Sequence, residues 1–181
     1  MTHAIRTLTV ADEVIAWEIL RYAAHEDSLA AVLEHPTVAR YAKSWGRDGD
    51  LGFVAVDGDR TLGAAWVRLW PDGERGFGWV RDDIPELTIA VLPDCRGRGI
   101  GTQLLQCVLE AARSRFSAVS LSVRADNPAV RLYERLGFVQ VPETDICNRV
   151  GGSSFKMVHK FSSGGMSAIA HPLKTCSDET I

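Results

Sequence analysis

Residues 86–105 read ELTIAVLPDCRGRGIGTQLL and place three local patterns in direct succession. The apolar run 87–92 ends at Pro93, and such a run is typical of a strand that is covered on both faces in the centre of a sheet. A glycine cluster follows, and from residue 99 to residue 116 apolar residues recur at helical spacing. The order of strand, glycine loop and helix indicates a domain that combines helices with a sheet.

The glycine loop has the composition of an anion-binding site. It comprises Arg96, Gly97, Arg98, Gly99, Ile100, Gly101 and Thr102. Glycines let backbone N–H groups approach an anion closely, arginines pair with phosphate, and the start of a helix adds about half a positive charge. The loop is therefore predicted to hold a pyrophosphate. It does not match the Gly-Lys-Ser/Thr or Gly-x-Gly-x-x-Gly fingerprint, so an ordinary P-loop or Rossmann site is disfavoured.

A second glycine motif, GERGFG at residues 73–78, has nearly the same spacing. It follows a Pro-Asp-Gly turn, and no helical pattern comes after it. We expect a loop there, without a role in anion binding.

The flanking segments continue the alternation of expected strands and helices, and together they form one predicted domain, residues 1–161. Strands are expected at 5–10, 51–56, 62–69, 87–92, 118–123, 138–141 and 154–161. Helices are expected at 12–23, at 28–41 with an interruption near Pro36, at 99–116, and from Asn127-Pro128 to Gly137. The Asp57-Gly58 pair predicts that 51–56 and 62–69 form an antiparallel hairpin. Residues 162–181 are rich in Ser and Gly and are expected to form a flexible tail.

Composition excludes several classes of protein. With 181 residues, 46% hydrophobic and 24% charged, the chain fits one folded domain rather than a disordered or coiled-coil protein. The longest uncharged run, 161–173, is too short and too interrupted to span a membrane, and a net charge of −3 provides no general attraction for nucleic acid. The four cysteines and five histidines are widely spaced, so no metal site is expected. Residues 1–6 lack the apolar stretch of a secretory signal, and we expect a cytoplasmic protein.

The charges are unevenly distributed along the chain. Between residues 96 and 136 seven arginines stand against three acids, whereas between 48 and 86 nine acids stand against four arginines. One half could hold an anion and the other attract a cationic substrate, or both could be ordinary solvated surfaces. The residues Trp45, Trp66, Trp70 and Trp79 flank the acidic stretch. They could line an acceptor groove or pack in the core.

Two ordered motifs together resemble the GNAT superfamily of N-acetyltransferases. They are residues 86–105 and, further along, residues 127–138, NPAVRLYERLGF. The similarity covers roughly residues 5–161 and implies a mixed, mostly antiparallel sheet flanked by helices, with one pair of parallel strands that splay apart. It also implies direct transfer of an acetyl group from acetyl-CoA to a primary amine of a small molecule or peptide. No metal takes part in the chemistry that the resemblance implies.

The resemblance assigns roles to named residues that bind the co-substrate. The amides of the loop from Arg96 to Thr102 would hold the pyrophosphate of acetyl-CoA. The backbone groups of Ile89, Ala90 and Val91 would pair with the pantetheine arm and the acetyl carbonyl. Asn127 would contact the co-substrate, although Asn127 considered alone is also a good helix cap.

The same resemblance gives two residues catalytic roles. Tyr133 would donate a proton to the departing CoA thiolate, and Glu86 stands where some members of the family supply a carboxylate that deprotonates the amine. A base or a water relay is needed because a free lysine-type amine has a pKa of about 10.4. Without the resemblance, Tyr133 is equally a core aromatic residue and Glu86 a solvated charge at a strand end. Ser122 stands where the branch that acetylates ribosomal-protein N-termini carries a glutamate, which disfavours that branch.

A rival hypothesis keeps the CoA site without catalysis. The chain would then be a CoA-binding or sensing module whose acceptor side is closed or adapted to a protein partner. A longer acyl donor would change the pocket but not the mechanism. The sequence does not decide between a monomer and a homodimer.

Overall fold

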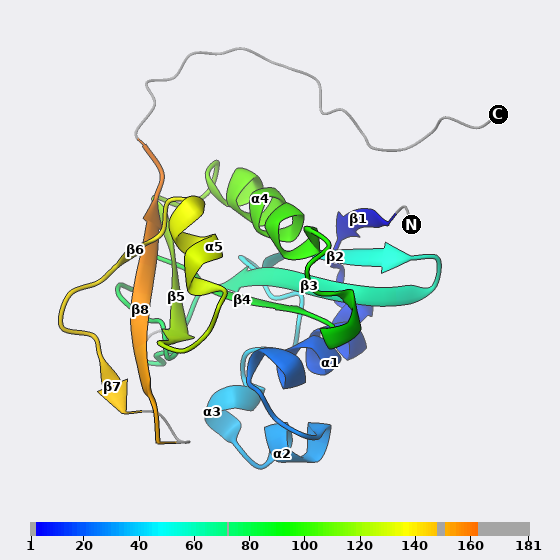
Figure 1. The fold of residues 1–181 in the computed structure, drawn as a ribbon, viewed down its shortest axis with the longest axis horizontal. Helices are drawn as coiled ribbons and strands as arrows, with labels where there is room; N and C mark the ends of the chain where they lie inside the picture. The colour runs from blue at the N-terminus through cyan, green and yellow to red at the C-terminus, as the bar shows by residue number, and fades with distance from the viewer. Residues whose placement is uncertain (1–2, 72, 148–150, 163–181) are drawn as a thin grey trace.

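A computed structural model describes residues 3–71, 73–147 and 151–162, and the described chain forms one mixed sheet with helices on both faces (Figure 1). The strands are β1 (Ala4–Thr7), β2 (Leu51–Asp57), β3 (Arg60–Arg68), β4 (Glu86–Val91), β5 (Ala118–Arg124), β6 (Val139–Gln140), β7 (Ile146–Cys147) and β8 (Ser153–Lys160). Their order across the sheet is β1-β2-β3-β4-β5-β8-β6, and β7 also pairs with β8. Within this described part, β4 and β5 form the one parallel pair, while every other pairing is antiparallel. The predicted fold class is confirmed.

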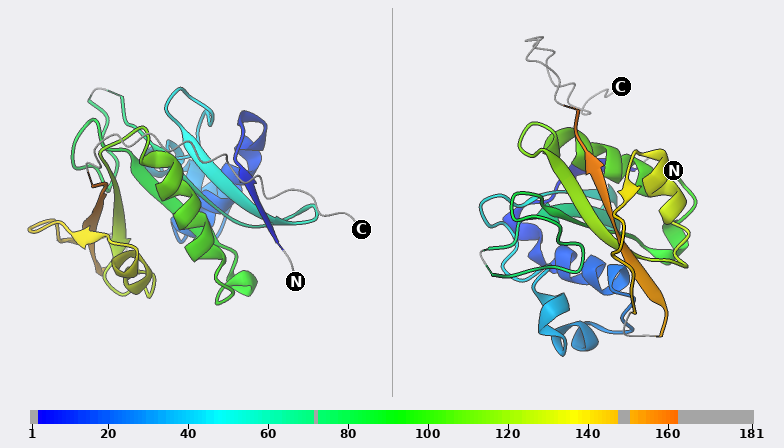
Figure 2. Two further views of the ribbon diagram at one scale, coloured as in Figure 1. Left: turned by 90° about the horizontal axis from the view of Figure 1, so that it is seen from above. Right: turned by 90° about the vertical axis from the view of Figure 1, so that its left-hand side faces the viewer.

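The helices are divided between the two faces of the sheet. They are α1 (Glu13–Ala23), α2 (Leu29–Leu33), α3 (Pro36–Ala39), α4 (Ile100–Ala112) and α5 (Val130–Arg135), with short 3₁₀ turns η1 (Val10–Asp12) and η2 (Pro93–Cys95). The first three helices pack on one face, while α4 crosses the other face diagonally over β2 and β3 (Figure 2). No helix in the described ranges is long and apolar enough to cross a membrane.

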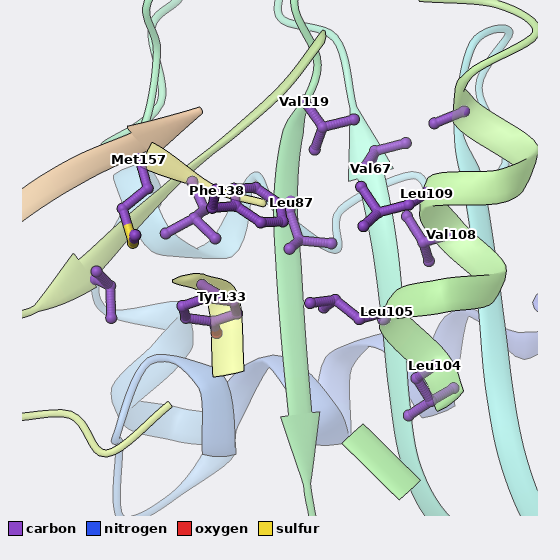
Figure 3. Close-up of a cluster of buried hydrophobic side chains, with 14 of the residues drawn as sticks. Val67, Leu87, Leu104, Leu105, Val108, Leu109, Val119, Tyr133, Phe138 and Met157 are labelled. Atoms are coloured by element: carbon purple, nitrogen blue, oxygen red, sulfur yellow. The ribbon is translucent and has the colours of Figure 1, made fainter. Parts of the chain in front are cut away.

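Two apolar clusters hold these layers together, one on each side of the sheet. The cluster beneath α4 joins Leu87 of β4 to Leu105 of the helix and to Tyr133 of α5 (Figure 3). The cluster beneath α1 contains Trp45 and Trp66, which are 3% and 0% exposed. Strand β4 is therefore covered on both faces over its first half, as predicted. Trp45 and Trp66 are core residues, so the idea that they line an acceptor groove is wrong, whereas Trp70 is buried with its indole donating to Glu86.

The predicted hairpin is present, with its turn one residue later than the Asp-Gly pair suggests. Asp57 pairs with Arg60, which leaves Gly58 and Asp59 as the two turn residues. Gly58 has a φ of +57°, a conformation that glycine adopts without steric cost. The two turn residues are therefore Gly-Asp rather than the expected Asp-Gly.

Several boundaries differ from those expected for physical reasons. The second helix is indeed broken near Pro36, because α2 ends at Leu33 and α3 begins at the proline. Helix α5 begins at Val130 rather than at Asn127, because the Asn127 side chain first forms a turn by accepting a hydrogen bond from the Ala129 amide. Helix α4 ends at Ala112, four residues earlier than expected, and β7 was not predicted. The expected tail lies outside the described residues except for Ser162.

Candidate functional site

Strands β4 and β5 part almost as soon as they meet. Their ladder registers a single pair, Glu86 with Ser120, whereas the antiparallel pairing of β3 with β4 continues along the whole of β4. Side-chain burial follows the separation, since Glu86, Leu87 and Thr88 are buried while residues 89–91 are only half-buried. An opening between two parallel strands therefore lies beside the second half of β4.

Backbone alternation determines which groups of β4 face this opening. At one end of the strand the Ser120 amide donates to the Pro85 carbonyl at 3.0 Å, and at the other end the Leu92 amide donates to the Leu62 carbonyl at 2.9 Å. Because successive residues of a strand direct their N–H and C=O groups to opposite edges, those of Ile89 and Val91 face β5. The backbone groups of Ala90 face β3 instead. Of the three backbone positions that the sequence suggested for the pantetheine arm, two are directed at the opening.

The glycine loop joins the end of β4 to the start of α4. Gly97 and Gly99 have φ values of +75° and +79°, and a Cβ added at either position would meet no atom within 4 Å. Glycine is therefore required here for the backbone conformation, and the space in front of the loop is open. The first backbone hydrogen bond of the helix runs from Gln103 to the Gly99 carbonyl at 3.1 Å. The amides of residues 100–102 precede that bond, so they and the positive end of the helix dipole are available to an anion.

The two arginines of the loop lie against its own backbone. Arg96 Nε donates to the Val91 carbonyl at 3.1 Å, and Arg98 Nη2 donates to the Asp94 carbonyl at 2.9 Å. Both side chains add positive charge beside the loop while they also brace it. The geometry thus favours the loop amides as the direct anion contacts, with the arginines as supporting charges.

Tyr133 lies on the α4 side of the opening with its ring in the core. The side chain is 8% exposed and packs edge-on against Phe138, with ring centroids 5.8 Å apart (Figure 3). Burial raises the pKa of its phenol to about 12, so it keeps its proton at neutral pH. Among the described residues the fully buried polar atoms without a partner are Trp45 Nε1 and His159 Nδ1, and the Tyr133 hydroxyl is not one of them. The ring therefore fills a core position, and the hydroxyl is not an orphaned polar atom.

Asn127 forms a side-chain turn after the end of β5. Its Oδ1 accepts a hydrogen bond from the Ala129 amide, two residues further on, at 2.9 Å, which is an Asx turn. The N-cap of α5 is Ala129, so Asn127 does not cap this helix as its residue type suggested. This contact occupies only the oxygen of the side chain. The amide nitrogen takes no part in this turn, so the turn and co-substrate contact are compatible.

Glu86 is buried, which makes its interpretation as a solvated strand-end charge wrong. The residue is 2% exposed, and Tyr41 and Trp70 beside it are each 6% exposed. Its Oε1 accepts hydrogen bonds from the Tyr41 hydroxyl at 2.7 Å and the Gly78 amide at 2.6 Å, and Oε2 accepts one from Trp70 Nε1 at 2.9 Å. Burial raises the pKa of the carboxyl, and these three donors oppose that shift.

The partners of Glu86 could not be found from the sequence. Tyr41 and Trp70 lie 45 and 16 positions before it, without any motif that links them to it. Gly78 belongs to the second glycine motif, which is a loop as expected, but its contact with Glu86 was not foreseen. The sequence therefore drew attention to the loop and to Trp70 but gave no signal for Tyr41.

Three acids of the acidic stretch have local partners. Asp50 is buried in an ion pair with Arg68, and Asp83 is paired with Arg81 on the surface. Asp82 accepts a hydrogen bond from Trp79 Nε1 at 2.9 Å. The structural interpretation is therefore supported for these three acids.

Comparison with known proteins agrees with this geometry. Residues 12–138 match the acetyltransferase (GNAT) family. A mycothiol acetyltransferase from Rhodococcus jostii is 35% identical over 111 residues, which cover 58% of this chain and 34% of that protein. An N-alpha-acetyltransferase from Sulfurisphaera tokodaii is 47% identical over 100 residues, which cover 49% of this chain and 56% of that protein. The chain thus spans about a third and about half of the length of these relatives.

Solved structures show the same fold at low sequence identity. The ribosomal-protein-S18-alanine N-acetyltransferase from Escherichia coli superimposes with a TM-score of 0.65 and 23% identity, covering 93% of this chain and all of that chain. An acetyltransferase structure from Salmonella typhimurium that contains its cofactor acetyl-CoA gives a TM-score of 0.66 and 20% identity, covering 94% of this chain and all of that chain. The family match extends over more than two thirds of the sequence and includes both motifs and the strands that part between them, so this chain belongs to the acetyltransferase (GNAT) family.

Proposed function

We propose that this chain transfers the acetyl group of acetyl-CoA to a primary amine of a small molecule or peptide. The observation that carries the proposal is the opening between β4 and β5, which lies directly beside a glycine loop with open space in front of it. The names of the related proteins support acetyl transfer as the reaction class. A cytoplasmic location and a monomer or homodimer are compatible with this reaction.

In this proposal the chain binds acetyl-CoA mainly through its backbone. The loop from Arg96 to Thr102 holds the pyrophosphate with amide N–H groups at the start of α4. The backbone groups of Ile89 and the amide of Val91 pair with the pantetheine arm as a neighbouring strand would, while the Val91 carbonyl keeps its bond to Arg96 and Ala90 keeps its bonds to β3. The amide nitrogen of Asn127 supplies a further polar contact from the β5 side.

Tyr133 and Glu86 then move the two protons. As the amine nitrogen attacks the acetyl carbonyl, a C–N bond forms and the C–S bond breaks. Tyr133 donates its phenolic proton to the leaving sulfur, which is possible because a pKa of about 12 keeps the phenol protonated. Glu86 takes the proton that the amine loses, and solvent restores both residues.

Two classes of acceptor deserve priority in a test. One relative is named for mycothiol and the other for an α-nitrogen, so a small-molecule amine and a peptide N-terminus are both represented. Putrescine and trialanine amide are simple probes of the two classes. Glucosamine adds a sugar amine to the panel.

The test combines binding and turnover in one preparation. Calorimetry should detect acetyl-CoA binding, and release of the CoA thiol should depend on one of the probe amines. We expect Tyr133→Phe to lower kcat by about a hundredfold while the Kd of acetyl-CoA stays unchanged. Binding without turnover on any amine would favour the CoA-sensing alternative, and the absence of binding would refute the proposal.

A further inference from the structure

The second glycine motif, which the proposed function does not use, lies directly over Glu86. The Gly78 amide donates to Glu86 Oε1 at 2.6 Å. The Phe77 amide donates to the Tyr41 hydroxyl at 2.6 Å, and that hydroxyl donates to the same Oε1 at 2.7 Å. Residues 76–78 are therefore tied to the carboxylate both directly and through Tyr41.

The two glycines allow this contact because they have no side chain. A Cβ at Gly76 would lie 1.8 Å from Glu86 Oε2, and a Cβ at Gly78 would lie 2.5 Å from the carbonyl carbon of Leu121. Neither glycine has a positive φ, so their backbone conformation does not require glycine. They are needed for close approach, and the segment leaves no room for an acceptor beside the carboxylate.

The groups that surround Glu86 suit a carboxylate and no other form of the side chain. The Trp70 indole N–H and the Gly78 amide can only donate, and the Tyr41 hydroxyl already accepts from Phe77 when it donates to Glu86. All three donors are neutral. The Arg40 guanidinium lowers the pKa of this carboxyl through its charge but is not one of the three donors. A cationic group that replaced one of the neutral donors would add a direct ion pair to the buried charge.

The ends of the segment are fastened, while its middle depends on Glu86 and Tyr41. The Arg40 guanidinium donates to the Arg75 carbonyl, and Lys156 Nζ donates to the Trp79 carbonyl at 2.6 Å. Arg75 also stacks on the Trp79 ring at 3.9 Å. Between these anchors the Phe77 ring is 40% exposed, lying over Tyr41 at the molecular surface.

We propose that residues 76–78 form a lid over Glu86 that the ammonium group of the acceptor displaces. This inference rests on the proposed function and adds that the acceptor must engage the site as a cation. An ammonium N–H replaces the Gly78 N–H on Oε1, and its proton passes to Oε1 before the C–N bond forms, because a protonated nitrogen has no lone pair for the attack. The resulting amine attacks the acetyl carbonyl, the C–S bond breaks and Tyr133 protonates the sulfur. The second proton that the nitrogen loses passes through solvent to the Tyr133 phenolate. Tyr41 holds the lid closed, because its hydroxyl accepts from the Phe77 amide while it donates to the same Oε1.

Weakening the lid should improve acceptor binding. A ligand that binds only the open state has an apparent Kd equal to its intrinsic Kd divided by the open fraction. Tyr41→Phe removes the hydroxyl that joins Phe77 to Glu86, and it should therefore raise the open fraction. We expect the KM of the probe amine that is turned over, trialanine amide or putrescine, to fall by about fivefold. The Kd of acetyl-CoA should not change. Tyr22→Phe is the matched control. Tyr22 lies on α1 with its ring under the Arg21 guanidinium, so loss of its hydroxyl should change neither the KM of the amine nor the Kd of acetyl-CoA.

Hydrogen exchange reports on the lid itself in the wild-type protein. The Phe77 and Gly78 amides should exchange slowly in the protein alone, and saturating probe amine should accelerate exchange at Gly78. Slow exchange that the amine does not alter, or a KM that stays constant or rises in a folded Tyr41→Phe protein, would make residues 76–78 a fixed wall and overturn the proposal. A chain that binds no acetyl-CoA and releases no thiol would instead refute the proposed function, so the two failures are distinguishable.

Discussion

At the scale of single residues, burial sets the chemistry of Tyr133. An unfolded phenol ionises with a pKa of about 10, whereas burial raises the pKa of Tyr133 to about 12 in the folded protein. Because the folded state binds this proton more tightly, the stabilisation is complete below pH 10 and is lost as the pH rises toward 12. The shift corresponds to about 3 kcal/mol of unfolding free energy.

Urea unfolding at pH 9 and pH 11.5 checks this prediction. The unfolding free energy of the wild-type protein should fall more steeply between these two pH values than that of Tyr133→Phe, which cannot ionise. Tyr41, whose pKa burial also raises, is present in both proteins and cancels in the comparison. Equal losses of unfolding free energy in the two proteins would show that the pKa of Tyr133 is close to that of a solvent-exposed phenol.

The residue scale also marks the limit of what the sequence reveals about the site. The loop from Arg96 to Thr102 could be predicted because its arginines, glycines and helix start are contiguous. The environment of Glu86 could not, because its donors come from three separate segments that only the sheet brings together. A carboxylate at a strand end has the same local sequence whether it is solvated or enclosed.

At the scale of elements, the glycine loop gives a test that separates backbone strain from ligand contact. Gly99 and Gly58 both have positive φ, and a Cβ at either would meet nothing within 4 Å. Alanine at either position should therefore destabilise the fold by a similar amount, about 1 kcal/mol. Only Gly99→Ala places a methyl group where the pyrophosphate is proposed to bind.

We expect Gly99→Ala to weaken acetyl-CoA binding by at least about tenfold, a change of about 1.4 kcal/mol. Gly58→Ala, in the β2–β3 turn, should bind as the wild-type protein does. Calorimetry on the two variants, with thermal unfolding to confirm equal strain, makes the comparison. Equal affinities in two folded variants would remove the loop from the binding site.

The same scale explains which elements were predictable. Strand β4, helix α4 and the β2–β3 hairpin have strong local periodicity and a turn signal, and their predictions are confirmed. Strand β7 has two residues and exists only because β8 pairs with it, so no local pattern announces it. The late start of α5 arises from a side-chain hydrogen bond of Asn127, which periodicity does not encode.

At the scale of the whole molecule, one buried ion pair ties the sheet to the segment that carries Tyr41. Arg68 on β3 is 0% exposed, and it makes a paired contact with Asp50 through Nε at 2.9 Å and Nη2 at 2.6 Å. Its Nη1 also donates to the carbonyls of Arg40 and Lys43 at 2.7 and 2.9 Å. The guanidinium thus organises the chain between α3 and β2 from within.

Asp50→Asn should destabilise the protein by about 3–5 kcal/mol, because it leaves the Arg68 guanidinium buried without its counter-charge. The matched control is Asp83→Asn, which breaks an exposed pair with Arg81 and should leave the unfolding free energy close to that of the wild-type protein. Chemical unfolding of the three proteins measures the difference. Similar stabilities for both variants would show that Arg68 is satisfied by the backbone carbonyls alone.

The single registered pair between β4 and β5 has a consequence for solubility. A sheet that opens in its interior leaves two strand edges without a partner strand, and such edges can pair with other chains. The proposed binding of acetyl-CoA along Ile89 and Val91 would cover one of these edges with a molecule that cannot extend the ladder to a further strand. In that case bound acetyl-CoA would also reduce aggregation, and the protein would self-associate most readily when acetyl-CoA is scarce.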